Sequence, residues 1–524
     1  MSAMDKSADY AVDFRDDQED DVVVDDRIGT LADRKAMARL GKEQVFKRNF
    51  SFVSILGFAL IIMNTWETIL TTVAFGLGNG GPGGLIWTFV AGWIGFLLVG
   101  ASMGEMASMA PTSGGQYHWV SEFAPPNVQK VLSYFIGWLG ILGYQTGTTI
   151  GAYVSGTLIQ GLIILNNPDS YVPERWHGTL IAMLITICVA FFNIFLAKHL
   201  PLVEGMILVL HIAGFVAIMV PLWVMAPRTS SSEVWTSFTD LNDWGSVGLA
   251  CLIGLITSAS SLVGGDAAAH MAEELKNSSK MLPRAMIGTI IVNGALGFVM
   301  LVTFLYTLGD LDEDIASATG YPIIQVFYTA TGSAGGATGL TIIIIILNIC
   351  SNLTTMAGSS RQMFSFARDK GVPYHHLIAR VPPGYDVPVN ALIVSVVWAC
   401  VFHCIYIGSA VAFNIIMSIG TVALLTSYMV SIGTITWKRI RGHPLLPSKF
   451  SLGKFGLPIN IASLLFCFIV YIFVFFPSMP NPEPIGMNWA IAVYGGVLVL
   501  AAIYFVLQAR HHYVGPVAYV RKTI

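Results

Sequence analysis

The sequence predicts an all-α integral membrane protein of about twelve transmembrane helices. Hydrophobic residues make up 54% of the 524 residues and charged residues only 11%, a balance that ordinary soluble domains do not show. The apolar residues gather into twelve stretches of roughly 20 or more, each long enough to cross about 30 Å of hydrocarbon. Of the 28 Lys and Arg residues, 26 fall on one side once these stretches are drawn as spans. This asymmetry predicts that both termini are cytoplasmic.

The predicted spans are, in order along the chain, 52–77, 85–109, 131–165, 176–196, 203–225, 247–271, 285–308, 340–364, 390–407, 412–437, 457–476 and 489–507. They divide the chain into a cytoplasmic N-terminal tail (1–49), a transmembrane domain (50–507) and a cytoplasmic C-terminal tail (508–524). The first half of the N-terminal tail carries ten acidic residues, too much charge to bury a core, so we expect the tail to be disordered. Its basic end can lie against anionic lipid or act only as a topology signal. We expect the first span itself to direct insertion, since no signal peptide is recognisable.

The first span carries polar residues at about half its depth, at Asn64, Thr65, Trp66 and Glu67. Such closely spaced residues occupy most faces of a helix, so at least one would meet lipid unless the helix opens there. The sequence therefore predicts a break in this span.

The sixth span carries a second such region, a hydroxyl-rich run that includes Ser261 and ends in Gly264, Gly265 and Asp266. A glycine pair costs a helix about 2 kcal/mol relative to alanine, which favours a break. Alternatively, the two glycines only allow close packing of helices.

A broken helix aims a partially positive N-terminus and a partially negative C-terminus at one point in the membrane. Such a point suits a small zwitterion or cation. The first and sixth spans start from opposite sides of the membrane and lie five spans apart, the arrangement of two inverted five-helix repeats with a site between them. The predicted substrate-binding residues are Asn64, Thr65, Trp66, Glu67, Ser261, Gly264, Gly265 and Asp266.

Four motifs resemble those of the amino acid, polyamine and organocation (APC) transporter superfamily. The segments 264–285, 105–119 and 360–373 are similar to its sixth-helix signature, the loop after its second helix and the end of its eighth helix. The segments 50–57, 64–66 and 124–126 look most like the fungal branch that contains GABA, choline and polyamine permeases. The resemblance implies a LeuT-like fold, with a 5+5 inverted repeat and two further helices. It also implies a secondary transporter, usually driven by protons, with substrate between helices one, three, six, eight and ten.

The chain departs from this superfamily at both predicted breaks. Asn64 and Thr65 stand where glycines are common, and Gly265 stands where an aromatic residue is common. Glu67 adds a carboxylate that many amino acid carriers lack.

Glu67 and Asp266 are charges within spans, and such charges face protein or water. No Lys or Arg lies at comparable depth, so each carboxylate should be protonated or paired with a cation that arrives with the substrate. Asp266 could instead cap the second half-helix, and Glu67 could be a packing acid. Trp66 offers its ring to an ammonium group or is a plain packing residue.

His211 lies in the fifth span. The resemblance implies that prokaryotic members of the superfamily have a lysine at this place, and that the lysine substitutes for a coupling sodium ion. Because histidine titrates near neutral pH, His211 is the candidate for proton coupling. The alternative is a neutral histidine that donates to a backbone carbonyl. Glu273 and Glu274 could pair with Arg361 and close the cytoplasmic side, as a gate.

We therefore expect a proton symporter that moves a small amine-containing solute, an amino acid or GABA, across the plasma membrane. The alternative substrate class is choline or a polyamine, and the alternative location is the vacuolar membrane. A non-transporting nutrient receptor is the alternative from a different functional class. The chain shows no nucleotide-binding loop, metal-ligand spacing or ring of filter residues, so we expect no enzyme, cofactor, metal or channel. No basic groove predicts a nucleic acid partner. The expected partners are the substrate, protons and the lipid bilayer.

Overall fold

The computed structural model describes residues 23–25, 29–309, 311–408 and 411–517. Within this part of the chain, twelve helical spans are long and apolar enough to cross a membrane, which confirms the predicted number and the all-α class. The first 22 residues of the predicted tail, and residues 518–524, lie outside the described residues.

The helices and strands are β1 (Val23–Asp25), β2 (Gly29–Thr30), α1 (Leu31–Arg39), α2 (Phe52–Met63), α3 (Thr65–Gly78), α4 (Gly81–Met109), α5 (Gln116–Phe123), α6 (Gln129–Asn166), α7 (Arg175–Phe195), η1 (Ala197–His199), α8 (Leu200–Met225), α9 (Ser231–Thr236), α10 (Val247–Leu262), η2 (Ala267–Glu274), α11 (Ser278–Tyr306), α12 (Leu311–Ile315), α13 (Pro322–Thr331), α14 (Ala334–Arg368), α15 (His375–Ile378), α16 (Val389–Gly408), α17 (Ala412–Ile440), η3 (Gly453–Phe455), α18 (Gly456–Phe473), α19 (Ala490–Tyr504), η4 (Phe505–Ala509) and α20 (Arg510–His512).

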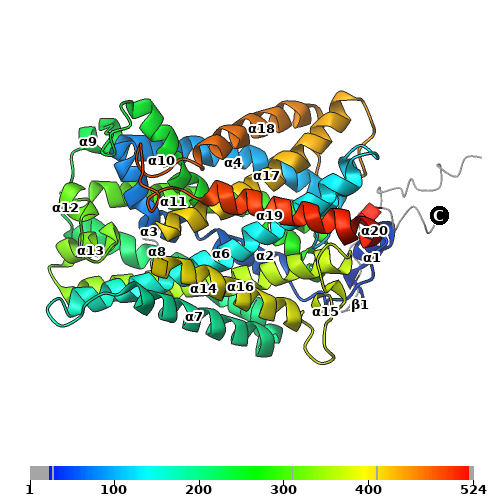
Figure 1. Ribbon diagram of the computed structural model, residues 1–524, viewed down its shortest axis with the longest axis horizontal. Coiled ribbons are helices and arrows are strands. Elements are labelled where there is room, and N and C mark those ends of the chain that lie inside the picture. Colours follow the sequence, from blue (N-terminus) through cyan, green and yellow to red (C-terminus); the bar gives the residue numbers. More distant parts are fainter. Residues whose placement is uncertain (1–22, 26–28, 310, 409–410, 518–524) are drawn as a thin grey trace, which may run out of the picture.

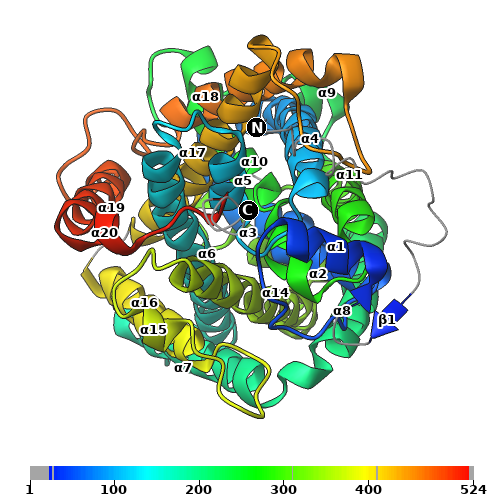
Figure 2. The ribbon, with the colours of Figure 1, turned by 90° about the vertical axis from the view of Figure 1, so that its right-hand side faces the viewer.

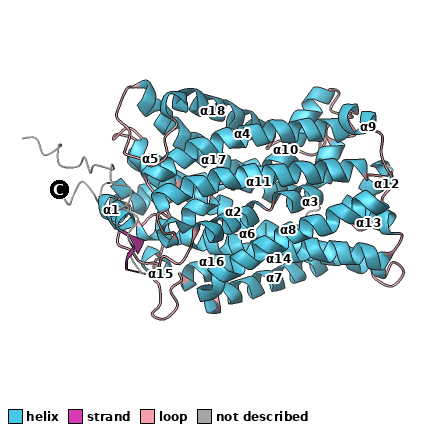
Figure 3. Cartoon of the chain, turned by 180° about the vertical axis from the view of Figure 1, so that it is seen from behind, coloured by secondary structure: helices cyan, strands magenta, loops and turns pink. Residues whose placement is uncertain are grey.

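The long helices run side by side between two faces (Figures 1 and 3). One face, which we call the terminal face, holds α1, α15 and α20. The opposite face, which we call the loop face, holds α9, α12 and α13. Figure 2 looks onto the terminal face, with α6 and α14 near the middle of the bundle and α7, α16 and α19 at its edge.

The core of the bundle is built from five spans. These are α2 with α3, α6, α10 with η2, α14 and α17, and between 61% and 83% of each is buried, against 17% to 50% of the other spans. In order along the chain they are spans one, three, six, eight and ten. Polar residues concentrate in these spans because their side chains can avoid lipid there.

Part of the predicted disordered tail is folded. Residues 29–50, here called the docked segment, pack against the terminal face through α1. The Asp33 carboxylate accepts hydrogen bonds from the backbone N–H groups of Asn277 at 2.8 Å and Ser278 at 3.0 Å. These are N–H groups at the start of α11, which have no partner within the helix. The seventh span therefore begins at Ser278, seven residues before the predicted start.

Candidate functional site

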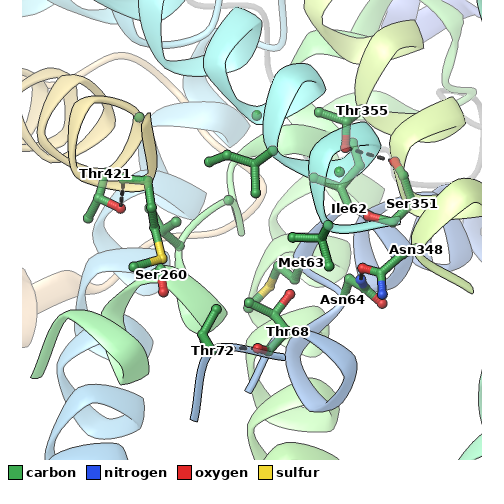
Figure 4. Close-up of a pocket in the computed structure, with 18 of the residues that line it drawn as sticks. Ile62, Met63, Asn64, Thr68, Thr72, Ser260, Asn348, Ser351, Thr355 and Thr421 are labelled. Carbon is green, nitrogen blue, oxygen red and sulfur yellow. Dashed lines mark hydrogen bonds between the residues drawn. The ribbon is translucent and has the colours of Figure 1, made fainter. Parts of the chain in front are cut away.

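A cavity of about 130 Å³ lies at the centre of the bundle, where the break in the first span meets the break in the sixth. Figure 4 shows polar side chains pointing into it from several of the core helices. No Asp, Glu, Lys or Arg is among the described residues that line it. The polar side chains in the lining are Asn64, Thr68, Thr71, Thr72, Tyr144, Ser260, Asn348, Ser351, Thr355 and Thr421.

The break in the first span is a single residue. Asn64 ends α2 in the left-handed conformation, with φ 45° and ψ 45°, and α3 starts at the next residue. Asparagine is one of the few residues other than glycine that adopt this conformation readily. Asn64 therefore does what glycine commonly does in the superfamily that this sequence resembles.

The Asn64 side chain connects the cavity to a buried carboxylate. In one orientation its amide nitrogen donates to Asn348 Oδ1 at 2.9 Å. Turned over, the same nitrogen donates to both carboxylate oxygens of Glu67, at 3.0 and 2.8 Å, and the amide oxygen faces Asn348. An ionised carboxylate only accepts hydrogen bonds, whereas a protonated one can donate. The Asn64 amide can therefore donate to an ionised Glu67 or accept from a protonated one.

Glu67 faces away from the cavity and pairs with His211 on α8. Glu67 Oε1 lies 2.7 Å from His211 Nδ1, and both side chains are fully buried. The ring of Trp66 packs on the same side, 5.6 Å from the His211 ring and 6.0 Å from Phe215. His211 Nε2 has no hydrogen-bond partner among the described residues. A buried acid–histidine pair with a free ring nitrogen can hold and release a proton.

The break in the sixth span uses its two glycines differently. Gly264 has a φ of +102°, which a residue with a side chain rarely adopts, and it lines the cavity. At Gly265 an added Cβ would lie 2.9 Å from the side chain of Ile290 on α11. One glycine therefore opens the helix and the other allows close packing. Ser261 donates to the Ser258 carbonyl at 2.9 Å within α10.

Asp266 is fully buried beneath the cavity and joins three elements of the core. Its carboxylate accepts hydrogen bonds from Gln116 Nε2 at 2.5 Å, from the Tyr144 hydroxyl at 2.7 Å and from the Tyr428 hydroxyl. His270 Nε2 lies 3.8 Å away. The sequence also allowed Asp266 to act as a helix cap, but its side chain makes no capping hydrogen bond at the start of η2. Because Tyr144 lines the cavity, its hydroxyl connects Asp266 to the cavity wall.

Two ion pairs lie near the terminal face of the bundle. Glu274 Oε1 lies 2.9 Å from Arg361 Nε, one of the pairings predicted for the gate. Glu273 pairs instead with Arg368, which donates to both of its carboxylate oxygens at 2.9 and 2.7 Å. Because the Glu273 side chain is buried and its pairing is bidentate, this contact should be stronger than an exposed ion pair.

The docked segment covers these ion pairs. Lys42 forms an ion pair with Asp369, and Gln44 Nε2 donates to the Glu273 carbonyl at 2.6 Å. Arg48 donates to the Ala272 carbonyl at 3.1 Å. Burial lowers the pKa of the Lys42 ammonium, and the Asp369 carboxylate opposes this effect. Neither Arg368 nor this segment was predicted to belong to the gate.

A larger cavity of about 790 Å³ opens on the loop face. It shares Thr71, Thr72 and Phe413 with the central cavity. These three residues therefore border both cavities, while the ion pairs and the docked segment lie on the side of the terminal face.

The structure places the predicted substrate-binding residues in two groups. Asn64 and Gly264 line the cavity. The others lie one layer behind it and remain predictions as substrate contacts: Thr65, Trp66, Glu67, Ser261, Gly265 and Asp266. The polar residues of α14 and α17 were missed. The signal for those on α14 is the run of amide and hydroxyl residues between Asn348 and Thr355 within an otherwise apolar span.

Comparisons with known proteins agree with this geometry. Residues 50–498 match the sequence pattern of the amino acid permease family. A protein of Macrophomina phaseolina (strain MS6), whose name proposes an amino acid/polyamine transporter, is 31% identical over 84% of this chain and 97% of its own length. A choline transporter of Saccharomyces cerevisiae is 27% identical over 94% of this chain and 87% of its own length.

The fold is similar to that of a crystal structure of a manganese transporter mutant from Eremococcus coleocola. The TM-score is 0.54 at 12% identity, over 90% of this chain and 95% of that one. This similarity concerns the fold alone. It confirms the predicted LeuT-like architecture of two inverted five-helix repeats followed by two further helices.

Proposed function

This chain belongs to the amino acid permease family, and on that premise we propose that it is a proton symporter for a small amine-containing solute, an amino acid or GABA. It is a multi-pass membrane transport protein and not an enzyme. The observation that carries the proposal is the small, uncharged cavity between two helix breaks, with the buried Glu67–His211 pair directly behind it.

The helix ends favour a solute with an amine at one end and a carboxylate at the other. The C-terminal ends of α2 and α10 point carbonyl groups with partial negative charge at the cavity, and the start of α3 points N–H groups with partial positive charge. Amides and hydroxyls can complete either contact. A volume of about 130 Å³ limits the solute to a small molecule.

Choline is the second candidate. The similarity to the choline transporter of Saccharomyces cerevisiae supports it, because that protein aligns with most of this chain. Choline carries a fixed positive charge and no carboxylate, so it would use the carbonyl groups at the helix ends and not the N–H groups. Polyamines are also positively charged, but they are longer molecules than choline.

The proton and the solute are linked through Asn64. When Glu67 is protonated it can donate to the Asn64 amide oxygen, which leaves the amide nitrogen for Asn348 in the cavity wall. When Glu67 is ionised it attracts the amide nitrogen instead. Proton binding at Glu67 and His211 therefore changes which polar groups the cavity offers to a solute, as coupled transport requires.

The gate supports alternating access. In this structure a larger cavity on the loop face shares three lining residues with the central cavity, and the two ion pairs lie near the terminal face. Release of solute on the terminal side would require the Glu274–Arg361 and Glu273–Arg368 pairs to separate. The docked segment would have to move with them, since Gln44 and Arg48 bond to the backbone beside Glu273.

A competition assay tests the substrate class. Full-length protein in proteoliposomes is offered labelled GABA or labelled choline, with unlabelled amino acids, GABA, choline and putrescine as competitors. We expect competition by one class of small amine. Absence of uptake of every labelled amine, with correctly inserted protein, would favour the non-transporting receptor.

We place the terminal face in the cytoplasm of a cell whose plasma membrane holds the protein. Cysteine labelling tests this orientation in a variant whose six native cysteines are replaced. Ala318→Cys on the loop face should react with an impermeant reagent added outside, and Pro444→Cys on the terminal face should not, since both residues are exposed. Labelling of both from one side would contradict the twelve-span topology.

A further inference from the structure

Glu204 is a buried acid without a countercharge. It lies in the second turn of α8, and its side chain is fully buried. Thr354 on α14 donates to Glu204 Oε1 at 3.0 Å, and Oε2 has no hydrogen-bond partner in the described part of the chain. A lone hydroxyl does not compensate a carboxylate for the loss of water, so Glu204 should be protonated or exchange a proton.

The surroundings of Glu204 offer it no cation. Helix α2, which packs against α8 there, has no titratable side chain, and a Cβ on its Gly57 would lie only 3.1 Å from the Glu204 carbonyl oxygen. The titratable or charged side chains of the other elements packed against α8 are Glu67 on α3, Cys350, Arg361 and Arg368 on α14, Lys280, Arg284 and Tyr306 on α11, Tyr328 on α13, and Lys198 and His199 on η1. None of the hydrogen bonds or ion pairs found among the described residues joins any of them to Glu204.

Glu204 and His211 lie on the same face of α8. They are seven residues apart, which is two helical turns or roughly 10 Å along the helix axis. Both are among the buried residues of this helix, as is Ile207 between them. Because α8 starts at the terminal face, Glu204 is the nearer of the two to that face. Cys350 lies one turn from Thr354 on α14.

We propose that Glu204 is a second proton-binding residue, which takes the proton from the Glu67–His211 pair toward the terminal face. This proposal rests on the proposed function. The two atoms without a partner, His211 Nε2 and Glu204 Oε2, are the ones that exchange the proton. The N–H bond at Nε2 of the imidazolium breaks and an O–H bond forms at Oε2, with intervening water as the carrier. The His211 imidazolium becomes neutral imidazole and the Glu204 carboxylate becomes a neutral acid. The net charge of Glu67, His211 and Glu204 is unchanged, and the negative charge without a countercharge moves from Glu204 to Glu67.

The test compares two kinds of transport in proteoliposomes that contain the full-length protein. Labelled GABA or choline is used, whichever the wild type takes up. Exchange is measured at equal pH on both sides, and accumulation is measured under an imposed proton gradient. We expect Glu204→Gln to keep exchange within about twofold and to lower accumulation about tenfold. Glu204→Asp, which restores a titratable group, should recover part of the accumulation. Glu483→Gln, an exposed acid on the loop face, serves as the matched control.

Two outcomes would overturn the role of Glu204. One is wild-type accumulation by Glu204→Gln. The other is an equal loss of exchange and accumulation, which a merely structural residue would produce. If the wild type itself shows no proton-driven accumulation, the proposed function fails, and infrared spectroscopy then tests Glu204 separately. A carboxyl band that titrates with pH and is missing from Glu204→Gln supports proton binding at this residue, and an identical band in both proteins refutes it.

Discussion

The substitution Asp266→Asn is expected to lower uptake of the transported amine by more than about tenfold. The Asp266 carboxylate accepts hydrogen bonds from Gln116, Tyr144 and Tyr428, which come from three different helices. An asparagine would turn an N–H donor toward these donors and remove the charge that strengthens each bond, at about 1.5 to 3 kcal/mol per bond. Initial uptake rates of labelled substrate in proteoliposomes measure the effect.

Glu483→Gln is the matched control for this loss, because it neutralises an exposed acid on the loop face and should transport at the wild-type rate. The amount of protein in the membrane and its melting temperature in detergent separate a transport defect from unfolding. Tyr428→Phe, which removes one of the three donors, should have a smaller effect than Asp266→Asn. Wild-type uptake by Asp266→Asn would show that this carboxylate does not support the cavity.

The substitution His211→Ala is expected to lower uptake by more than about tenfold and to flatten its dependence on pH. It leaves the Glu67 carboxylate buried without its partner, and breaking a buried pair in this way costs about 3 to 5 kcal/mol. Glu67→Gln removes the carboxylate instead and should flatten the pH profile in the same way. Uptake measured over a range of external pH distinguishes these variants from the wild type.

His403→Gln is the matched control for the pH profile. His403 is also a fully buried histidine within a span, but its ring lies 3.1 Å from the Thr186 hydroxyl, and it is not among the residues that line the cavity. We expect this variant to keep the wild-type pH dependence. If His211→Ala kept it as well, His211 would be a packing residue, and proton coupling would have to run through Glu67 or Asp266 alone.

The two helix breaks could be predicted from the sequence, but the direction of each side chain around them could not. Asn64, Thr65, Trp66 and Glu67 follow one another, and successive residues of a helix point about 100° apart. They therefore cannot all face one cavity. Which of them does depends on the neighbours: α8 supplies His211 and Phe215 to Glu67 and Trp66, and α14 supplies Asn348 to Asn64.

The docked segment shows why local sequence patterns did not reveal the folded part of the N-terminal tail, residues 29–50. A run of charged residues indicates disorder when the charges have only water as a partner. Here Asp33, Lys42 and Arg48 each meet a fixed partner on the terminal face: N–H groups of α11, the Asp369 carboxylate and carbonyls that follow η2. These partners lie more than 200 residues away in the sequence, so no local pattern reveals them.

The measurement that tests the central claim most directly is the accumulation of labelled GABA, or of labelled choline, against its own gradient in proteoliposomes with a pH gradient across the membrane. We predict accumulation when the loop-face side is the more acidic, and its loss when a protonophore is added or when His211 is replaced by alanine. Uptake that only equilibrates the solute, and that neither the pH gradient nor the protonophore changes, would contradict proton-coupled transport through the cavity between the two broken helices.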